Sequence, residues 1–315
     1  MNFGVIGTWR MSYEGIVSAI PLLKKKDCCG NAVVKAVSVV EDYPYYKSVG
    51  YGGLPNCDGI VELDAAFMNG QTLSIGAVAA THNIKNPIKV AQKLSNENFN
   101  NVLVGCGADS YAKKHKFSFK NMLSPRAKQT YLKKLKLLKL NPKLSPYDGH
   151  DTVGIITLDT NGNMFAGVSS SGLFMKLPGR VGDSPFPGCG YYADQAIGGA
   201  TATGLGEDIM KGCLSYLTVQ YMKTMSPTKA AQKTVSEFTK DLKKRFGKCG
   251  PISIVALDKN GNYGVGTNVE FSFVAANHTQ KPIVYLAKPN KDKVLIEVAS
   301  QKWLDEYDRK HKAAI

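Results

Sequence analysis

Residues 152–172, TVGIITLDTNGNMFAGVSSSG, consist of two apolar runs separated by an Asn-Gly-Asn turn. An Asn-Gly pair between two such runs is a strong short-range signal for an antiparallel β-hairpin. Residues 252–268, ISIVALDKNGNYGVGTN, have the same arrangement, and residues 60–81 have a similar one around Asn-Gly-Gln. Because strands joined by tight turns run antiparallel, these hairpins predict antiparallel sheets.

Helical periodicity fills much of the chain between the hairpins. Apolar residues between Ala32 and Val40 recur at the spacing of one helix face. Pro87 and Pro227 mark the first turns of two further helices, where the missing N–H costs little. Helices are predicted for residues 12–23, 32–40, 86–95, 205–224 and 227–245, and further strands for residues 2–9 and 101–105. This segregation predicts an α+β fold, with antiparallel sheets covered by helices, rather than a parallel doubly wound sheet.

The net charge of +15 is concentrated in one segment. Residues 111–143 hold eleven Lys or Arg and no Asp or Glu, whereas the other 282 residues carry 29 basic and 25 acidic side chains. The run YLKKLKLLKL, residues 131–140, also fits a basic amphipathic helix, which could bind a membrane or RNA. We favour a solvated basic linker over residues 111–150. Aromatic residues do not interleave this run as in a base-stacking platform, so no nucleic-acid or membrane partner is predicted.

Several other classes of protein lack support in the sequence. No apolar run approaches 18 residues, and the start MNFGVIGTWR does not read as a secretory signal. The seven cysteines include no CxxC pair, so we expect a reduced, cytoplasmic setting. There is no GxxxxGK[ST], HExxH or GxSxG motif, and GATATGLG, residues 199–206, does not follow a convincing strand. The sequence therefore predicts neither a cofactor nor a metal.

Three ordered motifs lie in the glycine-rich half of the chain: HDTVG at 150–154, PGRVGDSP at 178–185 and ATATGLGE at 200–207. Through these motifs the chain resembles the asparaginase-2 family of N-terminal nucleophile hydrolases, and within it the glycosylasparaginases. The resemblance extends upstream through Trp9, SVGYGGLP, VELDA and IKNPI, and covers roughly residues 5–275. It implies a four-layer αββα sandwich and a homodimer of αβ units.

The resemblance also implies a precursor that cleaves itself between Asp151 and Thr152, giving an α chain, 1–151, and a β chain, 152–315, from a single domain. The Thr152 hydroxyl would attack the preceding carbonyl through a five-membered ring and shift the acyl group from N to O. Water would then hydrolyse the ester. The α-amino group released, with a reference pKa near 7.7 to 8.0, suits a general base on the same residue as the nucleophile.

Further roles carry over from the family. Arg180 would bind the substrate α-carboxylate through two parallel charged hydrogen bonds, and Asp183 would bind the α-ammonium. The Thr203 hydroxyl and the Gly204 N–H would form the oxyanion hole. Taken singly, such residues are more often a surface ion pair or polar groups at strand ends. Taken together with HDTVG, they favour a catalytic site.

Three positions concern the surroundings of the nucleophile. Ser170 stands where the family usually has threonine, and it keeps the hydroxyl. Trp9 matches a tryptophan near the family's active site, although a core tryptophan is the competing interpretation. Met11 stands where we expect an aromatic residue in that family, and this departure affects the carbohydrate side of the pocket.

The leading hypothesis is an enzyme that hydrolyses N4-(β-N-acetylglucosaminyl)-L-asparagine, a small-molecule glycosylated asparagine, to aspartate and the aminosugar. An isoaspartyl dipeptidase or L-asparaginase would share the nucleophile and the Arg180/Asp183 clamp but differ in the leaving-group pocket. A threonine endopeptidase is disfavoured because the clamp requires free α-groups. A noncatalytic protein that binds acidic partners through residues 111–143 is the alternative from another class.

Overall fold

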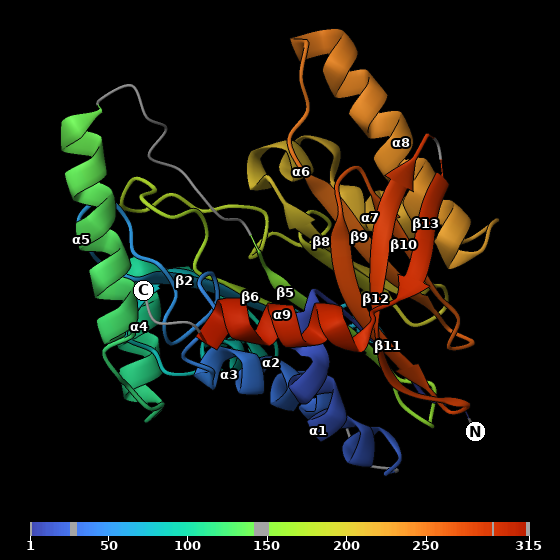
Figure 1. Ribbon diagram of the computed structural model, residues 1–315. Coiled ribbons are helices and arrows are strands. Elements are labelled where there is room, and N and C mark those ends of the chain that lie inside the picture. The colour runs from blue at the N-terminus through green and yellow to red at the C-terminus, as the bar shows by residue number, and fades with distance from the viewer. Residues whose placement is uncertain (1, 26–29, 142–150, 292, 313–315) are drawn as a thin grey trace.

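The computed structural model describes residues 2–25, 30–141, 151–291 and 293–312, which form two β-sheets with helices packed against them (Figure 1). The strands are β1 (Gly4–Thr8), β2 (Glu62–Asn69), β3 (Ile75–His82), β4 (Val102–Val104), β5 (Val153–Leu158), β6 (Met164–Ser170), β7 (Tyr191–Asp194), β8 (Gly198–Gly204), β9 (Ile252–Asp258), β10 (Tyr263–Thr267), β11 (Phe271–Asn277), β12 (Gln280–Asn290) and β13 (Lys293–Val298). One sheet has nine strands in the order β13-β12-β11-β1-β5-β6-β2-β3-β4, and the other has four in the order β10-β9-β8-β7.

The helices are interspersed with the strands along the chain. They are α1 (Tyr13–Leu23), α2 (Asn31–Asp42), α3 (Pro87–Leu94), α4 (Gly105–Lys114), α5 (Pro125–Leu140), α6 (Gly206–Gly212), α7 (Leu214–Tyr221), α8 (Pro227–Phe246) and α9 (Gln301–Lys312). The single helix predicted over residues 205–224 is divided into α6 and α7. Cys213 separates the two because it adopts a left-handed conformation with φ of 46°.

The α+β class and the three predicted hairpins, β2–β3, β5–β6 and β9–β10, are confirmed as antiparallel pairs. The prediction of purely antiparallel sheets is wrong at one edge. There β4 pairs with β3 in parallel, because α3 lies between them in the chain and carries it back across the sheet.

The apolar residues of β5 alternate between two buried clusters. Val153 and Ile155 belong to the cluster formed with α1, α2 and α3, whereas Ile156 and Leu158 pack against residues of the four-stranded sheet. A further cluster joins that sheet to α7 and α8 (Figure 1). Both faces of β5 are therefore buried, which explains why its sequence is almost continuously apolar instead of alternating with polar residues.

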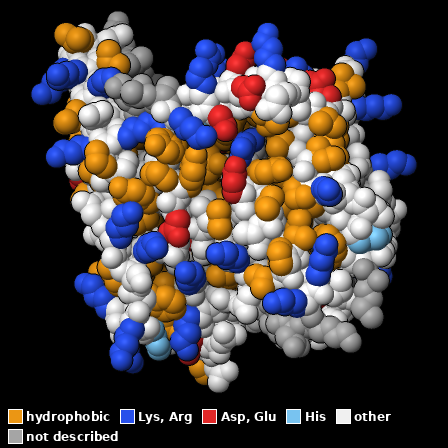
Figure 2. All heavy atoms as spheres, turned by 60° about the horizontal axis from the view of Figure 1, so that its bottom comes forward, with side chains coloured by type: hydrophobic (Ala, Val, Ile, Leu, Met, Phe, Trp, Pro, Cys, Tyr) orange, Lys and Arg blue, Asp and Glu red, His pale blue; other side chains and the backbone are white. Residues whose placement is uncertain are grey.

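The segment predicted to be a basic linker contains a long helix, α5, drawn in green in Figure 1. The Ser124 hydroxyl caps it by accepting a hydrogen bond from the Ala127 N–H, and the Tyr131 hydroxyl bonds to the Cys57 carbonyl. Residues 142–150 of the predicted linker lie outside the described residues. Figure 2 shows Lys and Arg side chains spread over a whole face of the molecule, with a few acidic ones among them. Within the described ranges, no helix is long and apolar enough to cross a bilayer.

Candidate active site

Thr152 lies directly before β5, at the edge of the nine-stranded sheet where β5 begins and its antiparallel neighbours β1 and β6 end. Its side chain is buried. The neighbouring strand β1 contributes Thr8, whose hydroxyl donates to the Thr152 carbonyl over 2.5 Å and accepts the Gly154 N–H over 2.8 Å. These two bonds hold the backbone on both sides of Val153 against β1, so Thr152 has a fixed position at the edge of the core.

The Thr152 hydroxyl donates a hydrogen bond to Ser170 Oγ over 3.3 Å. The register of the hairpin brings the two residues together, because Val153 pairs with Ser169. Ser170 Oγ also accepts the Gly172 N–H over 2.9 Å, which fixes its orientation. The predicted position of Ser170 beside Thr152 is therefore what the structure shows.

Thr203 reaches Thr152 from the other sheet. Its Oγ1 accepts hydrogen bonds from the Thr152 amide nitrogen and from Trp9 Nε1, each over 3.0 Å. These two bonds use both acceptor positions of the hydroxyl, so Thr203 can act on another group only as a donor. No strand was predicted over residues 198–204, but Thr203 lies in β8.

Gly204 follows Thr203 with φ of 137°, a conformation that side chains rarely adopt. A Cβ at this position would lie only 2.1 Å from the Pro251 carbonyl oxygen. The glycine is thus required by the close approach of the β9 end of the sheet and by its own backbone conformation. Gly204 also lines a small recess in front of Thr152.

A small recess in front of Thr152 brings together the residues singled out in the sequence. It is lined by Ser170, Arg180, Asp183 and Gly204, together with Asp64, Gly172, Leu173, Gly182, Ser184 and Gly206. Asp183 is buried, and its Oδ2 has no hydrogen-bond partner among the described residues. Burial raises the pKa of Asp183 to about 7; Arg180 opposes this shift and Asp64 adds to it. A buried carboxylate with an unpartnered oxygen is suited to receive a cationic group.

Arg180 is already paired on one edge of its guanidinium. Its Nε and Nη2 donate to the two carboxylate oxygens of Glu207 over 2.8 and 2.6 Å. The other terminal nitrogen, Nη1, lies between Gly172 and Gly182, since a Cβ added to either glycine would stand 3.1 Å from it. The expected pair of parallel bonds must therefore use the Nη1 and Nη2 end of the group. Glu207 was not among the predicted site residues, although it ends the ATATGLGE motif.

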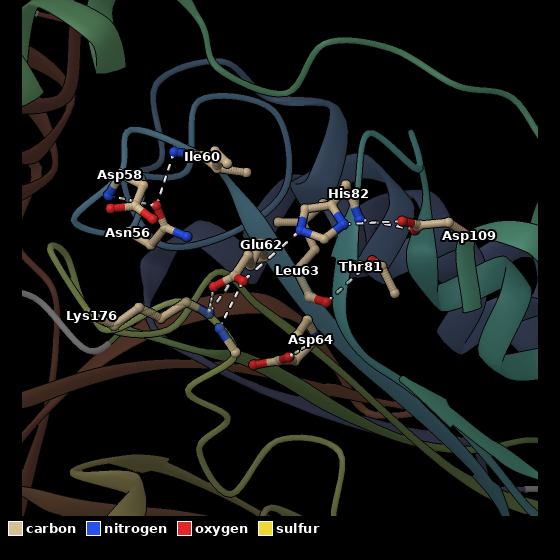
Figure 3. A network of polar contacts seen from close by, with 12 residues as sticks. Asn56, Asp58, Ile60, Glu62, Leu63, Asp64, Thr81, His82, Asp109 and Lys176 are labelled. Atoms are coloured by element: carbon tan, nitrogen blue, oxygen red, sulfur yellow. Dashed lines mark hydrogen bonds and ion pairs between the residues drawn. The ribbon is translucent and has the colours of Figure 1, made fainter. Parts of the chain in front are cut away.

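A chain of charged side chains below the recess was also not anticipated (Figure 3). Lys176 is almost fully buried, and its ammonium lies 3.7 Å from Glu62 Oε2. His82 connects Glu62 to Asp109, with its Nδ1 3.0 Å from the Asp109 carboxylate. Beside them, Asp64 accepts the Ala80 N–H over 2.8 Å. Burial raises the pKa of Asp64, and the nearby Lys176 opposes this shift.

Trp9 is half-buried, and it both packs against a core residue and lines a cavity. Its ring packs edge-on against Phe271 with a centroid distance of 4.9 Å, and it also lines a cavity that includes Asp151. Its backbone, with φ of 60° and ψ of 159°, lies in a region that is nearly restricted to glycine, which is a strain typical of functional sites. Met11, in contrast, is buried in the cluster against α1 and α2 and lines no wall of that cavity.

Comparison with known proteins identifies the family of the chain. The model of the asparaginase-2 family, described as asparaginase, matches residues 12–286, and the chain belongs to this family. It is 37% identical over 280 residues to an N(4)-(β-N-acetylglucosaminyl)-L-asparaginase of Elizabethkingia miricola, covering 88% of this chain and 82% of that protein. It is 32% identical over 287 residues to the protein of the same name from Rattus norvegicus, covering 78% and 80%. A Drosophila melanogaster protein named as a putative member of the same group is 33% identical over 313 residues, covering 87% and 78%.

Proposed function

We propose that this chain is an amidohydrolase that cleaves the side-chain amide of N4-(β-N-acetylglucosaminyl)-L-asparagine and releases aspartate and the aminosugar. One observation carries the proposal: a single recess holds a buried threonine hydroxyl, an arginine and a buried carboxylate with an unpartnered oxygen. The names of the relatives from Elizabethkingia miricola and Rattus norvegicus support the choice of substrate.

Thr152 becomes the N-terminal residue of a β chain by self-cleavage after Asp151. The hydroxyl attacks the Asp151 carbonyl, the acyl group moves from nitrogen to oxygen, and water hydrolyses the ester. The contacts of Thr152 support this step, because its hydroxyl donates to Ser170 and its amide nitrogen is held by Thr203. Cleavage leaves a free α-amino group beside the nucleophile, in position to act as a general base.

In the mature enzyme, Thr152 Oγ attacks the amide carbonyl of the substrate and gives its proton to the α-amino group of the same residue. The Thr203 hydroxyl donates to the oxyanion, which agrees with its two accepted bonds, and the Gly204 N–H is the second donor. As the C–N bond breaks, the leaving nitrogen takes a proton from the α-ammonium of Thr152. Water then attacks the β-aspartyl ester, the α-amino group accepts its proton, and aspartate leaves.

The free α-groups of the substrate give the site its selectivity. Asp183 binds the α-ammonium with its unpartnered Oδ2, and Arg180 binds the α-carboxylate with its Nη1 and Nη2 end. Glu207 holds the guanidinium in this orientation. Because both contacts need free α-groups, an asparagine inside a peptide is a poor substrate.

The architecture that accompanies this function is a four-layer αββα sandwich in a single domain, with two αβ units forming a dimer. The three apolar clusters support the layering, since each contains residues of a sheet and of the layer next to it.

Denaturing electrophoresis tests the cleavage. The wild type is expected to give two fragments of nearly equal mass, because residues 1–151 and 152–315 divide the 34.1 kDa chain almost in half. The Thr152→Ala variant is expected to remain whole. A single band from aged wild-type protein contradicts the proposal and favours a noncatalytic role.

Aspartate release tests the substrate. The mature protein is assayed on N4-(β-N-acetylglucosaminyl)-L-asparagine, L-asparagine and a β-aspartyl dipeptide. The highest kcat/KM is expected on the glycosylated substrate. A preference for either of the others assigns the same recess to an L-asparaginase or an isoaspartyl dipeptidase.

A further inference from the structure

A second cavity, here called the α9 cavity, is lined by Asp151, the residue directly before Thr152. Its volume is about 350 Å³, and its walls include Trp9, Asp151, Glu270, Phe271, Trp303 and Tyr307. Thr152 lines the recess, whereas Asp151 lines the α9 cavity. The two spaces are therefore lined by consecutive residues of the chain, and of the two only the recess is lined by Arg180 and Asp183.

Trp9 connects the α9 cavity directly to the reacting atoms. Its ring forms part of the cavity wall, and its indole N–H donates to Thr203 Oγ1, which also accepts the Thr152 amide N–H. A substrate whose α-groups occupy the recess has its scissile amide at Thr152. The group leaving from that amide must point away from Arg180 and Asp183, and the α9 cavity, which is lined by Asp151 and Trp9 but not by those two side chains, can receive it.

The walls of the α9 cavity combine aromatic faces with charged groups at the rim. The Trp303 and Tyr307 rings stack with a centroid distance of 5.4 Å, and Tyr307 stacks on His311 at 3.9 Å. Glu270 forms an ion pair with Lys288, which lines the same cavity. A pyranose ring has the matching character, with C–H groups on its faces and hydroxyls around its edge. Rigid aromatic faces bind such a ligand with little loss of side-chain entropy, and charged rim groups can accept or donate to its hydroxyls.

The aromatic wall is contributed by a helix outside the region shared with the family. The family match ends at residue 286, and α9 begins at Gln301. The helix is nevertheless fixed to the body of the protein: Arg10 lies 3.5 Å from the Asp308 carboxylate and over the Tyr307 ring, and Leu304 packs against the core. Arg126 of α5 donates to the His311 carbonyl.

We propose that the α9 cavity is the leaving-group subsite and binds one N-acetylhexosamine ring, with Trp303 and Tyr307 determining this specificity. The proposal rests on the proposed function, because it assigns the leaving group of that reaction. It adds that this chain recognises the sugar through its own C-terminal helix.

The two tryptophans of the chain, Trp9 and Trp303, both line the α9 cavity, so intrinsic fluorescence reports on it selectively. Titration of the full-length protein with N-acetylglucosamine is expected to change the emission in a saturable manner. The Trp303→Ala variant is expected to bind the sugar about tenfold more weakly, a typical effect of removing one aromatic contact. Trp303→Phe, which keeps an aromatic ring and Trp9 as the reporter, is expected to retain most of the affinity. Absence of a saturable change in the wild type overturns the proposal.

Kinetic measurements distinguish a role of Trp303 in substrate specificity from a purely structural role. The Trp303→Ala variant is expected to lose about tenfold more kcat/KM on the glycosylated substrate than on L-asparagine, whose leaving group is ammonia. The matched control is Lys302→Ala, a change at an exposed neighbouring residue of α9, which is expected to behave as the wild type on both substrates. Equal losses on the two substrates overturn the proposal.

The two proposals fail in different ways. If the wild type binds N-acetylglucosamine but cleaves only L-asparagine, the proposed function fails and the sugar site stands. If it cleaves the glycosylated substrate with no sugar-dependent fluorescence and no effect of Trp303→Ala, the leaving-group assignment fails and the function stands.

Discussion

The hydroxyl of Thr152 lies 3.3 Å from Ser170 Oγ and donates to it, while Ser170 is held in turn by the Gly172 N–H. Two residues 18 positions apart thus form one polar unit, because the hairpin register puts them on neighbouring strands. This contact orients the proposed nucleophile, so it is the first target for mutation.

Ser170→Ala removes the acceptor for the Thr152 hydroxyl. A neutral hydrogen bond contributes about 1 kcal/mol, so we expect kcat to fall roughly fivefold with little change in KM. Ser170→Thr keeps the hydroxyl and is expected to retain activity. Steady-state kinetics of the two variants check this, and an unchanged kcat in Ser170→Ala would show that the contact does not orient the nucleophile.

Glu207→Ala removes the partner of Arg180 Nε and Nη2. We expect KM to rise by roughly tenfold because the guanidinium is no longer held toward the recess, whereas Glu207→Gln keeps part of the contact and has a smaller effect. Stability is expected to change by less than about 1 kcal/mol, since Glu207 is 44% exposed. Kinetics together with urea unfolding measure both quantities. A lower KM in Glu207→Ala would mean that Glu207 competes with substrate for Arg180.

Asp183 couples ligand binding to pH. Burial raises its pKa to about 7, so below pH 7 the free protein holds a proton there. An α-ammonium favours the ionised carboxylate, and its binding therefore releases that proton. We expect L-aspartate binding to the mature wild type to release close to one proton at about pH 6 and clearly less at about pH 8. Calorimetry in two buffers of different ionisation enthalpy measures this number.

The control for this measurement is Asp183→Asn, which has no proton to release at this position. The release of a proton on L-aspartate binding to this variant is expected to disappear at low pH. Equal proton release by the wild type at both pH values would rule out Asp183 as the linked group.

Glu41 of α2 makes stability depend on pH. It is fully buried, its Oε1 accepts the Ile88 N–H over 3.1 Å, and burial raises its pKa from 4.5 to about 8, opposed by Ser169. Between pH 4.5 and 8 the folded state keeps a proton that the unfolded state has lost. The free energy of unfolding therefore decreases as pH rises through this window, with a slope of at most about 1.4 kcal/mol per pH unit from this group.

Glu41→Gln removes the titration at this position while keeping an acceptor for Ile88. We expect the variant to be no more stable than the wild type near pH 5 and more stable near pH 9. Urea unfolding across this range measures the difference, and parallel curves for the two proteins would contradict the assignment.

Local signals predicted most of the elements around the site. Asn-Gly turns between apolar runs and prolines at helix starts act through neighbouring residues, so the hairpins and the helices α1, α2, α3 and α8 follow from the sequence. Strand β8 was missed because Gly198–Gly204, GGATATG, lacks bulky apolar residues. The structure gives the reason: a Cβ at Gly154 of β5 would lie 2.6 Å from Thr201 Oγ1 of β8, so small residues let the two sheets approach closely.

The motifs predicted Thr152, Ser170, Arg180, Asp183, Thr203, Gly204 and Trp9 as one group, and the described residues bring all of them to the same place. Glu207 was missed because a lone acidic residue at a helix start is common on protein surfaces. The buried Lys176 and its partner Glu62 were missed because neither follows a recognisable pattern, and their contact spans 114 residues of chain.

The sequence by itself determined the hairpins and most of the helices, because turn formation and periodicity depend on contacts between near neighbours, whereas the candidate site residues came from the resemblance to a known family. Only the tertiary structure decided that Thr203 from one sheet meets Thr152 from the other, that Glu207 holds one edge of Arg180, and that α9 closes a cavity beside Trp9. These contacts arise from the close packing of two sheets and a C-terminal helix, and such packing joins residues that no local rule relates.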